Sequence, residues 1–530
     1  MSDNTYDYIV VGAGSSGSVI ASRLSENPDV KVLLLEAGGS DNNLRIKTPA
    51  GTITLYTSKT YSWNYFSVPQ KEMNNREMHC PRGKALGGSA SMNSMLYIRG
   101  HASDYERWKD AGCEGWGWDD VLPYFRKSEK NMLGQDSKYH GTDGPLVVDK
   151  PKDPNPFTYR FLKAAQNALG VKENKDFNGG EMEGCGIYNV NQKDGKRLSS
   201  YQAFVAPVLA SRPNLTVKIN SQVDKLILDG NRVTGMQISD ESGTHMLNAR
   251  KEVILSAGAL GTPHILMRSG IGPEDQLKNA GIETLVNLPG VGQNLQDHLD
   301  GLVTVRSNNS KTLGFSVASL PAVLTSPFRY IFGRKGWLTT NYVEAGGFFK
   351  TPLATDLPDV QFHYVPGYRS HRGRLFEWGH GYAIHVCVLR PKSIGELRLG
   401  SKGELLLDYN FLSDMEDAKV LTEGMRLARK VLADTAYDDS RGTEMLPGKD
   451  VQSDEEMLAN IRQYGATVFH PVGTCKMGHD DMSVVTPDLK VKGLEGLRIA
   501  DASVMPTLIS GNTSAPCMMI GEKAADLIRA

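Results

Sequence analysis

The chain has 530 residues, and its 59 basic and 60 acidic side chains leave a net charge of −1 at neutral pH. This balance excludes a strongly basic nucleic-acid-binding protein and a chain with a long acidic tail. Hydrophobic residues make up 40% of the chain, which is enough to bury large cores and excludes disorder. At about 100–200 residues per domain, the length allows three or four domains, or two large ones built from separated segments.

Six cysteines lie far apart without a Cys-x-x-Cys pair, which argues against a zinc ribbon, an iron–sulfur site or a disulfide framework. We therefore expect reduced cysteines and no metal. The N-terminal residues run straight into a strand pattern without a signal sequence, and the uncharged residues 502–521 contain too many polar groups to span a membrane. These features predict a cytoplasmic protein without a transmembrane segment.

The first chemical motif lies between two predicted strands, residues 8–11 and 32–35. It reads Gly12-x-Gly14-x-x-Gly17, is followed by helical spacing, and an acidic residue, Glu36, closes the second strand. The glycines allow backbone N–H groups to approach a pyrophosphate at a helix N-terminus, and the carboxylate accepts ribose hydroxyls. The sequence predicts a nucleotide-binding βαβ unit, and this motif alone does not choose between NAD and FAD.

Later segments alternate between strand and helix patterns. Strands are predicted at residues 215–219, 223–228, 232–239, 253–256, 359–364, 382–389 and 395–399, and helices at about 121–127 and 415–432. The region after residue 305 has no glycine fingerprint. It is therefore the better candidate for a domain that covers the substrate.

Three further segments carry small or polar residues in patterns that suit a bound cofactor. Residues 82–97 contain Gly87-Gly88-Ser89 and Asn93, and residues 256–272 repeat a strand, a small-residue turn and a helix. The C-terminal region contains Phe469-His470-Pro471, Asp501-Ala502-Ser503 and Gly511-Asn512-Thr513. With these motifs the chain resembles the glucose–methanol–choline (GMC) family of FAD-dependent oxidoreductases over nearly its whole length, and within it the choline-dehydrogenase-like alcohol, sorbose and polyethylene glycol dehydrogenases.

The resemblance implies an α/β fold with two parts. The first is a discontinuous Rossmann-type FAD-binding domain made of residues 1–157, 195–305 and 465–530. The second is a substrate-binding cap domain, residues 158–194 and 306–464, with an antiparallel sheet flanked by helices.

The resemblance also implies the cofactor site. The residues expected around FAD are Gly12, Gly14, Ser15, Ser16, Gly17, Glu36, Trp63, Arg82, Gly83, Leu86, Gly87, Ser89, Asn93, Met95, Val223, Ala257, Asp501, Ala502 and Thr513. Members with covalently bound flavin carry histidine at the position of Met92. We therefore expect FAD to be bound non-covalently.

An alcohol becomes a carbonyl by losing a hydroxyl proton and a hydride, so a flavin enzyme needs a base beside the hydroxyl. His470 is the predicted base, and Asn512 is predicted to position the substrate oxygen. The expected reaction is oxidation of an alcohol, with a primary alcohol preferred, and transfer of the electrons to a quinone or an artificial acceptor. An alcohol oxidase that releases H₂O₂, or a lyase that keeps FAD structurally, stays an alternative.

Three other features have two interpretations each. Glu344 either faces a cationic substrate or is a buried carboxylate that caps nearby glycine amides. His298 is interpreted as structural. The apolar residues 315–332 form a lid or core segment or, less favoured, contact the periphery of the inner membrane, and Pro321 and Pro327 are expected to interrupt a continuous helix there.

Overall fold

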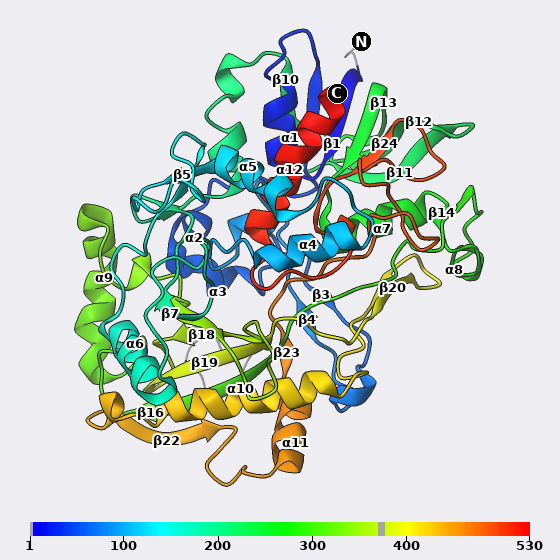
Figure 1. Ribbon diagram of the computed structural model, residues 1–530. Helices are drawn as coiled ribbons and strands as arrows, with labels where there is room; N and C mark the ends of the chain where they lie inside the picture. The colour runs from blue at the N-terminus through cyan, green and yellow to red at the C-terminus, as the bar shows by residue number, and fades with distance from the viewer. Residues whose placement is uncertain (1–3, 369–376) are drawn as a thin grey trace.

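The structure is a computed structural model that describes residues 4–368 and 377–530. Two seven-stranded sheets organise it, one near the chain termini in the upper part of Figure 1 and one in the lower part. The first three residues of the predicted FAD-binding domain lie outside the described residues, as do residues 369–376 of the predicted cap domain. The predicted α/β fold class is confirmed.

The upper sheet is mostly parallel. Its strands are β1 (Thr5–Val11), β2 (Val32–Leu35), β10 (Leu215–Lys218), β11 (Gln222–Asp229), β12 (Arg232–Asp240), β13 (Gly243–Leu255) and β24 (Leu497–Ile499). Their order is β10-β2-β1-β13-β12-β11, with β24 paired to β13. The four pairs among β10, β2, β1, β13 and β24 are parallel, whereas β11 and β12 extend the sheet as an antiparallel hairpin. The continuous apolar sequence of β2 is fully buried, as expected for a covered parallel strand.

Helices cover this sheet and join distant parts of the chain. They include α1 (Ser15–Leu24), α4 (Ala102–Asp110), α5 (Trp118–Ser128), α7 (Gly258–Arg268) and α12 (Ser514–Arg529). α12 packs against α1 and α5, so the C-terminal helix lies beside the first helix (Figure 1). A Cβ on Gly521 would lie 2.7 Å from the carbonyl oxygen of Ser16, which shows how closely α12 approaches α1.

The lower sheet is antiparallel. Its strands are β7 (Gly184–Ile187), β16 (Leu299–Ser307), β17 (Ala345–Phe349), β18 (Val360–Val365), β19 (His380–Val388), β22 (Arg441–Leu446) and β23 (Ala466–Thr467), in the order β22-β16-β19-β18-β17-β7, with β23 beside β16. Two helices, α6 (Pro156–Leu169) and α10 (Glu416–Leu432), pack on one face. Alternation along β18 places Val360, Phe362 and Tyr364 in that core. The intervening positions face the other side.

Further helices connect these layers, among them α2 (Leu44–Lys47), η1 (Pro49–Gly51), α3 (Thr52–Leu55), η3 (Gly88–Ser91), α8 (Glu274–Asn279), η6 (Val317–Ser319), α9 (Leu320–Gly333), η7 (Trp337–Thr339), α11 (Asp454–Tyr464) and η9 (Ala502–Val504). Five pairs of short strands form two-stranded ribbons: β3 (Tyr65–Phe66) with β4 (His79–Cys80), β5 (Glu129–Asn131) with β6 (Leu146–Val148), β8 (Gln192–Lys193) with β9 (Lys196–Arg197), β14 (Ile271–Gly272) with β15 (Val286–Asn287), and β20 (Glu396–Leu399) with β21 (Leu405–Asp408). In the described parts of the chain, no helix combines the length and the apolarity needed to cross a membrane.

The strand β16 includes residue 305, at which the expected FAD-binding segment ends, and the division into two domains stays a prediction. One expectation differs from the structure. The expectation that prolines interrupt residues 315–332 is wrong, because α9 continues through both of them. Pro321 lies in the first turn, where its missing N–H has no helical partner, and Pro327 is exposed, so only one helical hydrogen bond is lost.

Candidate active site

A cavity of about 1430 Å³ lies between the two sheets and is bordered by residues of both. On one side are the carboxyl ends of the parallel strands β1, β2 and β13, and on the other are residues of β16, β18 and β19. Open α/β sheets bind ligands at the carboxyl ends of their strands. The cavity therefore has a cofactor side, against the upper sheet, and a cap side, against the lower one.

The glycine fingerprint forms the turn from β1 into α1. Gly12 has a φ of +99°, a left-handed backbone that glycine adopts readily. A Cβ on Gly17 would lie 2.0 Å from the carbonyl oxygen of Gly12, so α1 approaches the turn too closely for any side chain there. A Cβ on Gly14 would meet no described atom within 4 Å, because this residue borders the cavity. The first N–H groups of α1, which Gly14 does not cap, fit a pyrophosphate.

Glu36 follows β2 and borders the cavity beside this turn. Its carboxylate accepts hydrogen bonds from the backbone N–H groups of Ala13 at 3.1 Å and Gly38 at 2.8 Å. Burial raises the pKa of Glu36 to about 7, and the two backbone bonds oppose this shift only in part. A carboxylate accepts about four hydrogen bonds, so Glu36 retains capacity for the two hydroxyls of a ribose.

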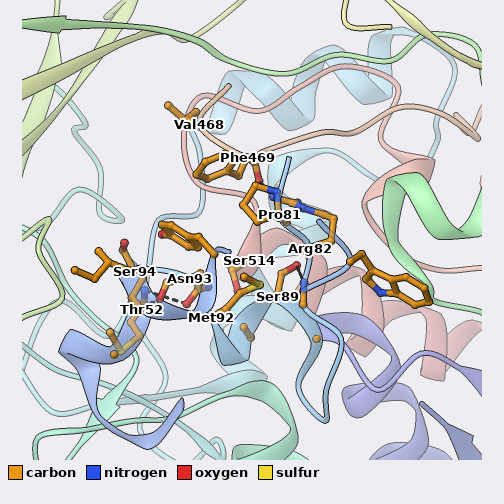
Figure 2. A pocket seen from close by; sticks show the side chains of 18 of the residues that line it. Thr52, Pro81, Arg82, Ser89, Met92, Asn93, Ser94, Val468, Phe469 and Ser514 are labelled. Carbon is orange, nitrogen blue, oxygen red and sulfur yellow. Dashed lines mark hydrogen bonds between the residues drawn. The ribbon is translucent and has the colours of Figure 1, made fainter. Parts of the chain in front are cut away.

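Residues 82–95 form another wall of the cavity (Figure 2). Ser89 Oγ accepts a hydrogen bond from the N–H of Gly83 at 3.1 Å, which closes the small-residue loop. Arg82 donates to the carbonyl oxygen of Phe469 at 2.6 Å and so ties this wall to the segment before His470. The wall is therefore bonded to the segment that carries the predicted base.

Arg197 is a buried cation that the sequence analysis did not identify. Its guanidinium donates to Asn93 Oδ1 at 3.0 Å and to Thr52 Oγ1 at 2.6 Å, as well as to two carbonyl oxygens. Burial lowers the pKa of Arg197 to about 10, so it stays charged at neutral pH. It pairs with no carboxylate among the described residues. Its sequence context is that of an exposed hairpin turn, so no pattern in the sequence signals this buried charge beside the Asn93 wall.

Most of the predicted cofactor residues border the cavity. They are Gly12, Gly14, Ser15, Ser16, Glu36, Trp63, Arg82, Gly83, Ser89, Asn93, Met95, Val223, Ala257, Asp501, Ala502 and Thr513. Three others, Gly17, Leu86 and Gly87, pack behind the wall instead. The N–H of Gly87, for example, donates to the carbonyl oxygen of Ala13 at 2.8 Å. Contact of each residue with a cofactor stays a prediction.

His470 enters the cavity from a constrained backbone. Phe469, directly before it, has a φ of +72°, which is rare for a bulky residue. The Phe469 N–H donates to Thr467 Oγ1 at 2.7 Å, and the His470 N–H donates to Asp297 Oδ1 at 2.9 Å. Thr467 also donates to the other oxygen of Asp297. These bonds fix the direction in which the imidazole leaves the chain.

The tautomer of His470 follows from the hydrogen bonds of His298. Nε2 of His298 lies 3.1 Å from the carbonyl oxygen of Ile509 and 3.2 Å from that of Leu389, so this nitrogen carries the hydrogen. Burial lowers the pKa of His298 to about 3, so its other nitrogen, Nδ1, is a bare acceptor at neutral pH. His470 Nδ1 lies 3.0 Å away and must donate to it. We therefore assign the hydrogen of neutral His470 to Nδ1, which leaves Nε2 as a bare base.

The electrostatics keep His470 neutral. Burial holds the pKa of His470 well below its ordinary value near 6.5, and His298, His363 and Arg82 lower it further. Asn512 Nδ2 donates to His470 Nε2 at 3.2 Å, and Asn512 Oδ1 accepts from Gln361 Nε2 at 3.2 Å. Gln361 belongs to β18, so the cap sheet orients the amide. His470 Nε2 and the amide N–H of Asn512 form an acceptor and a donor at one point of the cavity.

The structure decides between the two interpretations of Glu344. This residue is buried and does not border the cavity, so the interpretation as a contact for a cationic substrate is wrong. Its carboxylate accepts from the backbone N–H of Asn155 and from the hydroxyls of Thr158 and Thr340, each at 2.6 Å. It is a buried capping carboxylate, but it caps the N-terminus of α6 rather than the glycine amides.

Comparison with known proteins identifies the family. A GMC oxidoreductase family model matches residues 6–300, and a second GMC oxidoreductase model matches residues 391–521. The chain belongs to the GMC oxidoreductase family. It is 44% identical to an alcohol dehydrogenase (acceptor) of Pseudomonas putida, over 99% of this chain and 95% of that protein. It is 39% identical to an oxygen-dependent choline dehydrogenase of Rhizobium rhizogenes, over 98% and 95% of the two chains.

Solved structures agree with this assignment. Pyridoxine 4-oxidase from Mesorbium loti superposes with a TM-score of 0.88 and 32% identity over 98% of each chain. An FAD-dependent oxidoreductase from Chaetomium thermophilum superposes with a TM-score of 0.87 and 28% identity over 99% of each chain. The resemblance to the GMC family predicted from the sequence motifs is confirmed.

The different surroundings of Gly14 and Gly17 predict different effects of the same substitution. Gly14→Ala leaves the fold intact but raises the Kd for FAD by about tenfold or more, equivalent to a loss of about 1.4 kcal/mol, because its methyl group points into the cavity. Gly17→Ala lowers the stability of the protein by about 1–3 kcal/mol, because its methyl group overlaps the Gly12 carbonyl. Flavin titration and thermal unfolding separate the two effects. Wild-type FAD affinity in Gly14→Ala would contradict the assignment of the cofactor side.

The assigned tautomer predicts the effects of two substitutions at His298. His298→Leu leaves His470 Nδ1–H without its acceptor, so alcohol-dependent flavin reduction should slow by about 10²-fold. His298→Gln supplies an amide oxygen as acceptor and should retain most of the rate. The rate constant is measured by anaerobic stopped-flow absorbance from about pH 8 down to pH 6.5, where the wild-type value should stay constant because His470 remains neutral. Equal rates for the Leu variant and wild type would refute the positioning role.

Proposed function

We propose that the protein oxidises an alcohol, with a primary alcohol preferred, to the aldehyde or ketone with FAD as electron acceptor. The observation that carries the proposal is the Nε2 of His470, which carries no hydrogen and accepts from the amide N–H of Asn512, between the cofactor side and the cap side of the cavity. An alcohol hydroxyl needs an acceptor for its proton and a donor for its oxygen. Membership of the GMC oxidoreductase family and the named alcohol dehydrogenase relative support the same reaction.

The cofactor side fits FAD. The uncapped N-terminus of α1 suits the pyrophosphate, and Glu36 suits the ribose that follows it. Residues 82–95 and 501–513 would hold the isoalloxazine ring, with the charge of Arg197 behind them. When bound, FAD supplies the two-electron acceptor that receives hydride from the carbinol carbon.

The protein's own residues handle the proton and the oxygen. The substrate hydroxyl replaces the amide of Asn512 as the donor to His470 Nε2, which takes the proton when the alcohol is oxidised. His298 keeps the opposite nitrogen of His470 engaged, so the ring cannot present an N–H to the hydroxyl. The amide N–H of Asn512 donates to the substrate oxygen and stabilises the negative charge that develops on it. Burial excludes water from the base and strengthens both contacts.

The acceptor of the electrons is proposed to be a quinone or an artificial dye. The oxidase alternative is retained because the solved relatives include an oxidase. Stoichiometric H₂O₂ formation would favour it. A cytoplasmic location is also proposed, because all six cysteines are buried and unpaired, as suits a reducing compartment.

Non-covalent FAD is proposed because Met92 occupies the position at which flavinylated relatives carry histidine. The Met92 thioether is buried beside Ile46, Leu55 and Ala85 and offers no ring nitrogen for a bond to flavin. Acid precipitation of the protein should therefore release all of the yellow chromophore into the supernatant, where its absorbance is measured. A chromophore that stays with the pellet after washing would contradict the proposal.

The catalytic pair predicts the behaviour of two alanine variants. His470→Ala and Asn512→Ala should keep FAD bound, because neither side chain is needed to fill the Rossmann turn. Alcohol-dependent flavin reduction should fall by about 10²–10⁴-fold in His470→Ala, since the proton acceptor is lost. Anaerobic stopped-flow absorbance with aliphatic, aryl, sugar and amino alcohols gives the rate and ranks the substrates.

Reduction by dithionite, which needs no base, is the control for an intact flavin site. A His470→Ala variant that alcohol reduces at the wild-type rate would contradict the assigned base. Failure of every alcohol to reduce the wild-type flavin would favour the lyase alternative instead.

A further inference from the structure

Helix α9 carries a stripe of large apolar side chains on the surface of the molecule. Leu324 is 69% exposed, Phe328 is 64% exposed and Phe332 is 84% exposed, and their spacing of four residues places them on one face. Figure 1 shows α9 at the left edge of the molecule, outside the lower sheet. Within the described chain it packs mainly against the short helices η6 and η7. The outer face is therefore not used by the fold itself.

Other exposed apolar residues extend this stripe at its N-terminal end. Leu320 and Val317 are 43% and 73% exposed. Trp378 is 62% exposed and pairs by a backbone bridge with Phe315, directly before η6. Soluble proteins rarely expose a continuous group of large apolar side chains without a partner. Tryptophan is enriched where proteins meet the surface of a bilayer.

The opposite face of α9 belongs to the cavity. Val323 and the buried Ser326 border it. Ile331, which is 62% exposed and lies seven residues after Leu324 on the outer stripe, and the exposed Pro327 also border the cavity, at its rim. Tyr330 is buried and its hydroxyl donates to the carbonyl oxygen of Gly195 at 3.1 Å, which anchors the helix. The outer stripe of α9 therefore adjoins the rim of the cavity.

The charged side chains of α9 and of the segments directly before and after it in the chain are basic. Residues 301–343 contain five basic side chains and no aspartate or glutamate, in a chain whose net charge is −1. Arg329 and Lys335 are exposed, and Arg334 lies over the ring of Tyr330 at 4.6 Å. Two described acidic residues lie beside this segment: Asp153, which accepts from the backbone N–H of Gly336, and Glu377, which directly precedes Trp378. Within residues 301–343 the apolar stripe is therefore bordered by basic side chains.

We propose that this surface, named here the α9 face (residues 317–335 with Trp378), docks on an anionic lipid bilayer. Leu324, Phe328 and Phe332 enter the boundary between headgroups and acyl chains, while Arg329 and Lys335 contact lipid phosphates. An amphipathic helix with a basic border binds anionic membranes through both contributions. A second copy of the chain fits less well, because a twofold contact would bring identical basic residues together.

The docking has a consequence that rests on the proposed function. Because exposed residues of α9, among them Ile331, border the cavity, an alcohol dissolved in the bilayer can reach the cap side past this helix, without crossing bulk water. Docking itself requires neither FAD reduction nor a particular alcohol.

The test uses the FAD-bound full chain and vesicles of phosphatidylcholine with or without phosphatidylglycerol. Wild type should co-sediment with the anionic vesicles and detach at high salt. The triple variant Leu324→Gln, Phe328→Gln and Phe332→Gln should bind at least about tenfold more weakly. The charge variant Arg329→Gln with Lys335→Gln should lose the difference between the two vesicle types. The matched control, Met246→Gln with Leu285→Gln, changes exposed apolar residues of the upper part and should bind as wild type.

The outcomes distinguish this proposal from its alternatives and from the catalytic proposal. Equal binding of wild type and the triple variant, or equal binding of wild type to both vesicle types, would overturn it. A concentration-dependent dimer in sedimentation velocity that the triple variant abolishes would also overturn it, in favour of a second copy. The triple variant should still be reduced by a water-soluble alcohol, which shows that it is folded. If no alcohol reduces the wild type, the proposed function fails while vesicle binding stays unaffected.

Discussion

The hydrogen bond between the Nδ1 atoms of His298 and His470 decides which nitrogen of the predicted base is free. Its direction is imposed by two backbone carbonyls on the far side of His298, those of Leu389 and Ile509. One follows the cap strand β19 and the other belongs to the C-terminal segment. The base therefore exists in its active form only when the two parts of the fold meet. If the cap sheet moved away from the C-terminal segment, His470 would remain in the chain but its hydrogen would no longer be held on Nδ1.

The contact between the two parts of the fold also orients the second polar group of the site, the amide of Asn512. Gln361 on β18 orients the amide of Asn512, while alternate residues of that strand fill the core under α10. Period-two alternation thus lets one strand serve the core with one face and the site with the other. Burial in this place keeps His470 neutral, and its hydrogen-bond partners His298 and Asn512 are themselves bonded within the chain. The cost of burying these groups is offset by hydrogen bonds that also determine their orientation.

Much of the cofactor side could be predicted from the sequence, because its signals are local. The Gly12 turn, Glu36 and the strand at Val32–Leu35 follow from short-range spacing alone. His298 could not be recognised, since its role depends on carbonyls 91 and 211 residues away in the chain. Arg197 and Glu344 are similar cases, because burial of a charged group is a tertiary property. The continuity of α9 was mispredicted because a proline at an exposed helical position costs less than its propensity suggests.

The central claim, that His470 presents a bare Nε2 to the cavity at neutral pH, is tested most directly by nitrogen NMR. Histidine labelled with ¹⁵N in the FAD-bound protein, with His470→Gln and His298→Gln variants for assignment, reports which ring nitrogen carries hydrogen. The account predicts a protonated Nδ1 and an unprotonated Nε2 for His470, with the reverse for His298. A hydrogen on Nε2 of His470, or a doubly protonated ring at neutral pH, would contradict it.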